Sequence, residues 1–285
     1  MNREGLYEVL ESYREALVKR EAGAVRWGSA PLTSENNVML EPGDGLWGTI
    51  DAFGPYELRF ADPLNNQAGF FGTVHEHLEE SAYTLRLKTD DAGRILEAES
   101  VVVRQSDSGI KFENPRYWDK PILNAGAEDP VPREDMVQLA NGYFDTMQLN
   151  DGTLHTRFHP DCNRVENGVQ TTRNPEFAHI VPVAALGPEE QFRLGNYRYD
   201  DRLRARRFPL VDEERGLVLA FGFIDHCGHL AEYQLTDGRT VQSPVRRPHS
   251  FYFGELFKID SGMIRQIEAN FITVPYHMPS PWDSL

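Results

Sequence analysis

The sequence is short of cysteine and of basic residues, and it has no long apolar run. Two cysteines in 285 residues do not make a disulfide framework. The 29 Lys and Arg residues face 44 Asp and Glu, for a net charge of −15. We therefore expect no nucleic-acid partner and no anionic membrane partner, since each requires a basic face.

The start of the chain also lacks a targeting signal. Residues 2–20 are charged and have no apolar stretch of the kind found in secretory signals. No apolar run approaches the roughly 20 residues of a membrane span. A hydrophobic content of 40% is typical of a globular protein. We therefore expect a cytoplasmic globular protein.

Two segments show the apolar spacing of an amphipathic helix. The first stripe lies near the N-terminus, and the second follows Pro132 and two acidic residues that suit a helix start. Asn150-Asp151-Gly152 predicts the end of the second helix. The stripes consist of Leu6, Val9, Leu10, Tyr13 and Leu17, and of Met136, Leu139, Ala140, Tyr143, Phe144 and Met147.

Each half of the chain also ends in a similar way. "YTLRLKTDDAGRILEAESVVV" and "YFGELFKIDSGMIRQIEANFITV" both predict a long β-hairpin, with turns at residues 91–93 and 260–262. A third pair, "GFFGTVHEHL" and "FGFIDHCGHL", predicts an apolar strand that runs into histidines. Three correspondences in the same order predict a tandem repeat. We expect a first domain at 1–112, mainly structural, a linker at 113–131 and a second domain at 132–285 that contains the active-site pocket.

The repeat unit resembles the SnoaL-like family of the nuclear transport factor 2-like superfamily. The resemblance rests on "DGTLHTRFHPDCNRVENG", "ENNVMLEPGDGLWGT", "FADPLNNQAGFFGT" and "RRFPLVDEERGLVLAFGFIDH". It implies an α+β fold of two tandem cone-shaped barrels, each a curved antiparallel sheet wrapped around N-terminal helices. It also implies a deep apolar pocket and enzymes that work without a cofactor, using His and Asp as acid and base. Because one fold serves many functions, the fold alone does not decide the activity.

The segment 221–227 carries the first candidate site. If it is a strand, its side chains alternate, so Asp225 and His226 lie on opposite faces. Whichever of the two enters the cone then needs a partner from another element. Asp161 is a candidate partner for His226, and His159 or His249 for Asp225. A structural strand end with surface polar groups is the alternative.

The second candidate site is "FHPDCNRVENG". In an extended segment, Asp161, Asn163, Val165 and Asn167 share one face, and Cys162, Arg164 and Glu166 share the other. A plain turn is the alternative here. These two segments, together with Arg207, His249 and Tyr276 from elsewhere in the second half, supply a predicted catalytic set and a predicted substrate-binding set. We predict His226, Asp225, Asp161 and His159 for catalysis, and Asn163, Arg164, Glu166, Arg207, His249 and Tyr276 for binding.

Two groups of side chains are candidates for metal binding: Asp225, Cys227 and His229 in the second half, and His75 and His77 in the first. Neither group has the spacing of a known metal motif, so we expect no metal and no cofactor. Arg207 belongs to a charged run that suits a solvated strand face as well as an oxyanion contact. Tyr276 suits either a hydrogen bond into the site or a packing role.

We therefore expect a cofactor-independent lyase, dehydratase or isomerase that acts on a small apolar molecule, aromatic or hydroxylated. Loss of water and a retro-aldol step are both reactions that the predicted His and Asp acid–base residues can catalyse. Two alternatives stay open: a non-catalytic module that binds a small ligand or mediates association, and an epoxide hydrolase. A tandem repeat can replace the homodimer common in this superfamily, so a monomer and a homodimer both stay open.

Overall fold

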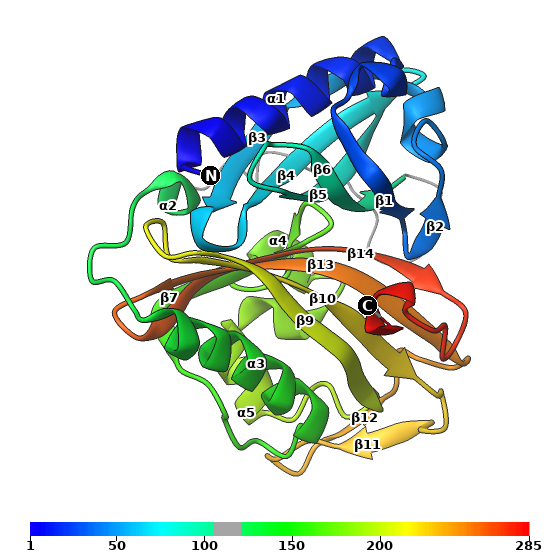
Figure 1. The fold of residues 1–285 in the computed structure, drawn as a ribbon. Helices are drawn as coiled ribbons and strands as arrows, with labels where there is room; N and C mark the ends of the chain where they lie inside the picture. The colour runs from blue at the N-terminus through cyan, green and yellow to red at the C-terminus, as the bar shows by residue number, and fades with distance from the viewer. Residues whose placement is uncertain (105–120, 285) are drawn as a thin grey trace.

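The computed structural model describes residues 1–104 and 121–284 and contains two six-stranded mixed sheets (Figure 1). In the first unit, the sheet order is β2-β1-β6-β5-β4-β3. Its elements are α1 (Arg3–Lys19), β1 (Trp27–Glu35), β2 (Val38–Leu40), β3 (Ile50–Asp62), β4 (Gln67–Glu76), β5 (Glu79–Thr89) and β6 (Ile95–Val103).

The second unit repeats this arrangement, with the sheet order β8-β7-β14-β13-β10-β9. In each unit one strand contact is parallel, β1 with β6 and β7 with β14. The equal strand order confirms the predicted tandem arrangement. The elements are α3 (Arg133–Leu149), β7 (Phe158–Glu166), β8 (Val169–Gln170), α4 (Pro175–Ala178), α5 (Pro188–Arg193), β9 (Arg202–Asp212), β10 (Leu217–His226), β13 (His249–Asp260) and β14 (Met263–Val274).

Smaller elements complete the described chain. A two-stranded ribbon lies outside the second sheet, and α2 precedes the second unit. They are α2 (Pro121–Asn124), β11 (Glu232–Gln234), β12 (Thr240–Gln242), and the 3-10 turns η1 (Ala22–Ala24), η2 (Gly45–Gly48), η3 (Pro63–Asn65), η5 (Pro182–Ala185) and η6 (Pro281–Ser284).

The two long helices form where the apolar stripes predicted them. The side chain of Asn2 caps α1 by accepting a hydrogen bond from the Gly5 amide, and α3 ends at Asn150 in the left-handed conformation. The stripe residues of α3 are buried, as are those of α1 apart from half-buried Val9. Each helix therefore covers one face of its own sheet.

The opposite faces of the two sheets pack against each other in the centre of the molecule (Figure 1). A single apolar cluster combines side chains from both units. Its buried members include Leu58, Phe60, Phe71, Val101, Leu219, Phe221, Phe223, Tyr252 and Leu256. Each sheet thus has an inner face toward its helix and an outer face toward the other sheet.

Reciprocal polar contacts join the units. Arg3 at the start of α1 pairs with Asp212 at the end of β9, at 2.7 Å, and Arg133 at the start of α3 pairs with Asp62 at the end of β3. Asp212 also accepts from the Ala61 amide at 2.9 Å, and Asp62 accepts from the Val211 amide at 3.2 Å. The units therefore meet in the way that the two copies of a symmetric dimer do.

The domain limits 1–112, 113–131 and 132–285 stay a prediction. The first sheet ends at Val103 and α3 begins at Arg133, and residues 105–120 lie outside the described part of the chain. Within the predicted linker, α2 places Leu123 in the central apolar cluster. This part of the linker is therefore packed against the fold.

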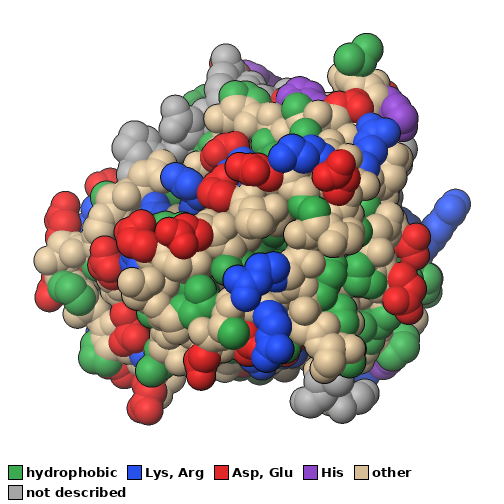
Figure 2. Space-filling view, turned by 45° about the horizontal axis from the view of Figure 1, so that its top comes forward, with side chains coloured by type: hydrophobic (Ala, Val, Ile, Leu, Met, Phe, Trp, Pro, Cys, Tyr) green, Lys and Arg blue, Asp and Glu red, His purple; other side chains and the backbone are tan. Residues whose placement is uncertain are grey.

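The surface carries mixed charge. On the face in Figure 2, Lys and Arg side chains are scattered among Asp and Glu side chains. Among the described residues, no helix combines the length and the apolar character needed to cross a membrane.

Candidate active site at the open end of the second sheet

Strand alternation in β10 separates Asp225 from His226, as predicted. Phe221 and Phe223, which share a face with Asp225, lie in the central cluster between the sheets. Ala220, which shares a face with His226, lies in the core beneath α3. His226 is therefore the residue that faces the interior of the second unit.

The carboxylate beside His226 is Asp200, which differs from the partners that the sequence predicted. Asp200 lies two residues before β9, and its Oδ1 is 3.0 Å from His226 Nδ1. The two residues are 7% and 1% exposed, so the pair lies almost entirely out of water. Burial raises the pKa of Asp200, and the neighbouring His226 opposes that rise. Asp200 Oδ1 and both ring nitrogens of His226 have no hydrogen-bond partner within the described residues, so the 3.0 Å contact is a close approach without hydrogen-bond geometry.

Aromatic rings surround the imidazole of His226. The ring of His249 lies 4.7 Å away, that of Phe251 4.9 Å and that of Tyr199 6.0 Å. His249, from the adjacent strand, pairs in register with His226. Burial lowers the pKa of His249; the contact with the Arg247 carbonyl opposes this, the nearby His226 adds to it, and Asp200 opposes it. The surroundings therefore favour a neutral imidazole at His249.

Near His226, the inner face of the second sheet is partly open to solvent. Ile224, Phe251 and Thr273 form one row across β10, β13 and β14, and all three are half-buried. Gly222 and Phe253, one row deeper, are buried. An apolar surface with a buried Asp–His pair at its edge is the chemistry expected of a small-molecule site.

Asp225 is committed to the opposite face. It accepts hydrogen bonds from Ser250 Oγ at 2.6 Å and Arg204 Nε at 2.7 Å. Its Oδ2 is 3.7 Å from His277 Nε2. Asp225 thus takes part in a buried ion-pair network beside the C-terminal segment, away from His226.

The predicted residues His159, Asp161 and Asn163 come together on the surface rather than in the interior. Asp161 is 91% exposed at its side chain, and its amide donates to His159 Nδ1 at 3.1 Å. Asn163 donates to the Asp161 carbonyl at 3.2 Å. None of these contacts links the three residues to His226.

Arg164 and Glu166 do enter the second unit, on the face that alternation predicted for them. Arg164 Nε is 3.2 Å from Glu166 Oε2, and Arg164 Nη2 donates to Gln191 Oε1 at 2.7 Å. Tyr197 contacts both Arg164 and Gln191. These side chains form a buried polar layer, deeper along the sheet than His226.

Arg207 and Tyr276 occupy other places. Arg207 pairs with Glu99 of the first unit, which is fully buried, and so belongs to the contact between the sheets. Tyr276 is half-buried, and its hydroxyl lies 3.5 Å from Asp201 Oδ2. Both side chains lie outside the His226 environment.

Sequence reasoning missed Asp200 and Tyr199. Both precede β9 in "YRYDD", a short segment with neither an apolar stripe nor a known motif. Pairing β9 with β10 around the turn at residues 213–216 brings Arg202 opposite Asp225. Two register shifts in this pairing, between Leu219 and Phe221 and between Phe221 and Phe223, place the residues just before Arg202 beside His226, so the turn alone did not predict the contact.

The first unit contains a cavity lined by Tyr13, Glu35, Trp47 and Tyr83, among others, with a volume of about 30 Å³. That is enough room for at least one water molecule. Side chains of the types that can bind a metal ion come together elsewhere, in a group of Asp201, Cys227 and His229 in the second unit.

Residues 129–271, half of the chain, match a family described as a domain of unknown function, DUF8021. The chain belongs to this family. The DUF8021 match runs from just before α3 into β14 and includes Asp200 and His226. No curated protein matches the chain.

Several solved structures resemble part of this DUF8021 protein. AusH from Aspergillus nidulans is 11% identical, with 38% of this chain and 89% of that chain covered and a TM-score of 0.31. An NTF-2 like protein of unknown function from Burkholderia xenovorans is 9% identical, with 38% and 91% covered and a TM-score of 0.31. A de novo designed protein with a curved β-sheet is 14% identical, with 36% and 88% covered and a TM-score of 0.30.

Proposed function

We propose that the second unit is a cofactor-independent lyase or isomerase with His226 as its acid–base residue. The observation that carries the proposal is the buried Asp200–His226 pair, joined at 3.0 Å at the half-open end of an apolar sheet face. The proposal keeps His226 from the four residues predicted for catalysis. It assigns the role of the orienting carboxylate to Asp200.

The pair is suited to moving a proton. His226 Nε2 is free to take a proton from a carbon next to a carbonyl group, and Asp200 stabilises the imidazolium that results. In a dehydration, the electrons of the broken C–H bond form a C=C bond. The hydroxyl group then departs and takes the proton back from His226 as water. In an isomerisation, His226 returns the proton to another carbon.

The side chains around His226 favour a small substrate with an apolar or aromatic body. Phe251 and Ile224 supply half-buried apolar surface, and Tyr199 and His249 place rings beside His226. A β-hydroxy ketone with a hydrocarbon or aryl group combines this body with an acidic C–H bond. This class of compound is therefore the first to test.

The test incubates the full chain with a panel of β-hydroxy ketones and follows the loss of water by mass spectrometry and by enone absorbance. Replacement of His226 by Gln is expected to lower kcat by at least about 100-fold, the usual minimum for loss of a general base. Asp200→Asn is expected to lower kcat and to change its pH profile. His179→Gln, at an exposed histidine of the same unit, is the control.

Equal turnover in the wild type and in His226→Gln would contradict the assignment of the base. A compound that binds the wild-type chain with its affinity dependent on Phe251, and that stays unconverted, would instead indicate a ligand-binding module. The same assay thus separates an enzyme from a binding protein.

A further inference from the structure

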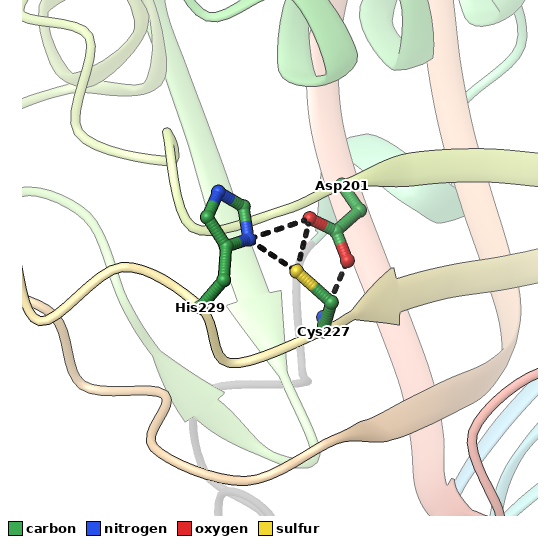
Figure 3. A group of neighbouring side chains, drawn as sticks. All are labelled: Asp201, Cys227 and His229. Atoms are coloured by element: carbon green, nitrogen blue, oxygen red, sulfur yellow. Dashed lines mark hydrogen bonds and ion pairs between the residues drawn. The ribbon is translucent and has the colours of Figure 1, made fainter.

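A second group of reactive side chains neighbours the Asp200–His226 pair in the sequence. In the structure its members contact one another and form a separate cluster. Asp201 follows Asp200, and Cys227 follows His226. Figure 3 shows that the side chains of Asp201, Cys227 and His229 point toward one another. Asp201 lies directly before β9, and Cys227 and His229 lie in the segment that follows β10.

The ligand atoms of these residues are close enough to share one ion. Cys227 Sγ is 2.9 Å from Asp201 Oδ1, and His229 Nδ1 is 3.6 Å from the same oxygen. Cys227 Sγ also contacts His229 Nδ1. The three atoms all lie within 4.8 Å of one another. The 3.6 Å between His229 Nδ1 and Asp201 Oδ1 suits an ion bound at about 2.0–2.3 Å from each ligand, and the shorter sulfur contacts are thiol contacts that the ion would replace.

The backbone holds the three residues in this arrangement. The Asp201 amide donates to the Asp225 carbonyl at 2.8 Å, and the Cys227 amide donates to Asp201 Oδ2. These bonds orient the carboxylate so that Oδ1 faces the thiol. Gly228 has a φ of +71°, and a Cβ there would lie 2.9 Å from the Arg247 nitrogen. The turn that returns His229 over Cys227 therefore requires glycine.

The donor set is typical of a zinc-class ion. Thiolate, imidazole and carboxylate are the ligands of zinc in proteins, and the thiolate and carboxylate together neutralise a divalent charge. Three protein ligands leave one position of a tetrahedron for water. The His229 side chain is 62% exposed, so an ion can reach the site from solvent.

A nucleophilic role for Cys227 fits this geometry less well. The pKa of the thiol is raised by burial and by its contact with the Asp201 carboxylate, so the thiol stays protonated at neutral pH. A metal ion reverses this situation, because it displaces the thiol proton and binds the thiolate.

We propose that Asp201 Oδ1, Cys227 Sγ and His229 Nδ1 bind one zinc-class divalent ion at the end of the β9–β10 pair. The ion joins the residue before β9 to the segment after β10 and so holds together the end of the hairpin that carries Asp200 and His226. This site does not depend on the proposed lyase or isomerase activity.

The test uses the full chain, stripped of metal with a chelator and titrated with Co²⁺. We expect one equivalent of Co²⁺ to produce visible d–d bands together with a near-ultraviolet thiolate-to-cobalt band, and we expect Zn²⁺ to abolish both. Cys227→Ser should remove the thiolate band. Asp201→Asn and His229→Gln should each weaken binding more than about tenfold, since even supporting residues of metal sites change affinity by 10- to 100-fold.

Two control variants test whether the thiolate-to-cobalt band and the binding of Co²⁺ come from the Asp201–Cys227–His229 cluster. Cys162 is fully buried, and burial raises its pKa to about 12, so Cys162→Ala should keep the thiolate band. His179→Gln should keep full affinity, since His179 is an exposed histidine outside the cluster. Circular dichroism checks that each variant is folded.

The outcomes decide the proposal. A thiolate band at one equivalent that disappears in Cys227→Ser and persists in Cys162→Ala supports it. The absence of stoichiometric binding in the wild type would overturn it. A band that survives in Cys227→Ser, or one that is lost in Cys162→Ala, would also overturn it.

Discussion

Glu255 is a buried carboxyl group whose surroundings keep it protonated near neutral pH. It lies on the inner face of β13 and is 3% exposed. Burial raises its pKa to about 8, and the charge of Glu166 adds to that rise, while Arg164 and Tyr143 oppose it. The free-energy cost of burying a charged carboxylate here is greater than the stabilisation that the Arg164 guanidinium would provide.

This pKa predicts a pH dependence of stability. Above pH 4.5, the ordinary pKa of the group, the unfolded chain loses the Glu255 proton while the folded chain keeps it up to about pH 8. The folded state then binds more protons, so the free energy of unfolding falls as the pH rises through this window. Urea unfolding at pH 5 and pH 8.5 should show this fall in the wild type and a smaller one in Glu255→Gln.

Glu15→Gln is the matched control for that measurement, because Glu15 is 71% exposed at its side chain. It should keep the pH dependence of the wild type. An unchanged pH dependence in Glu255→Gln would mean that Glu255 is ionised in the folded protein at neutral pH.

At the scale of elements, α3 depends on a glycine for its packing. A Cβ at Gly142 would lie 2.2 Å from the His155 carbonyl oxygen, because the segment after the helix folds back along it. The His155 amide donates to Thr146 Oγ1 at 2.8 Å, and Thr156 Oγ1 donates to the Leu139 carbonyl at 2.7 Å. These bonds hold the returning segment against the helix.

Gly142→Ala is therefore expected to destabilise the protein by about 1–3 kcal/mol through overpacking. Alanine favours a helix over glycine by about 1 kcal/mol, so a stabilising result would mean that the segment moves away freely. Chemical denaturation measures the difference. Gly23→Ala, where no atom lies within 4 Å of the new Cβ, should change stability by no more than about 0.5 kcal/mol.

At the scale of the whole molecule, the two units are joined by reciprocal ion pairs around a shared apolar core. Asp212 is fully buried and pairs with Arg3, and Asp62 is fully buried and pairs with Arg133. The core between the sheets contains side chains from both units. Because neither outer sheet face is covered without the other, we expect the units to unfold together. A homodimer of whole chains stays a prediction.

Asp212→Asn should destabilise the chain by roughly 2–3 kcal/mol, since it removes the buried charge that Arg3 faces and leaves only the exposed Glu214 to pair with it. The loss should be smaller than for a fully buried pair, because the Arg3 side chain is 18% exposed. Urea unfolding should show one transition, shifted to lower urea. Lys19→Ala, which removes an exposed ion pair with Glu15, should shift the midpoint little. Two separate transitions in the wild type would contradict the joint core.

The sequence by itself determined the elements and their repetition. The helical stripes, the turns at residues 91–93 and 260–262 and the alternation of Asp225 with His226 are local patterns. They follow from the repeat of 3.6 residues in a helix and of 2.0 residues in a strand, and these repeats do not depend on where an element packs. For the same reason, the division of Arg164 and Glu166 from Asp161 and Asn163 was predictable.

Only the tertiary structure decided which of these faces are interior and which residues meet. His226 faces the core because α3 covers that side of β10, while Asp225 faces the other unit. Asp200 reaches His226 only through the pairing of β9 with β10, and Arg207 meets Glu99 across the contact between the sheets. These two contacts join residues that are 26 and 108 positions apart. They depend on how whole faces pack, and no short sequence window records that.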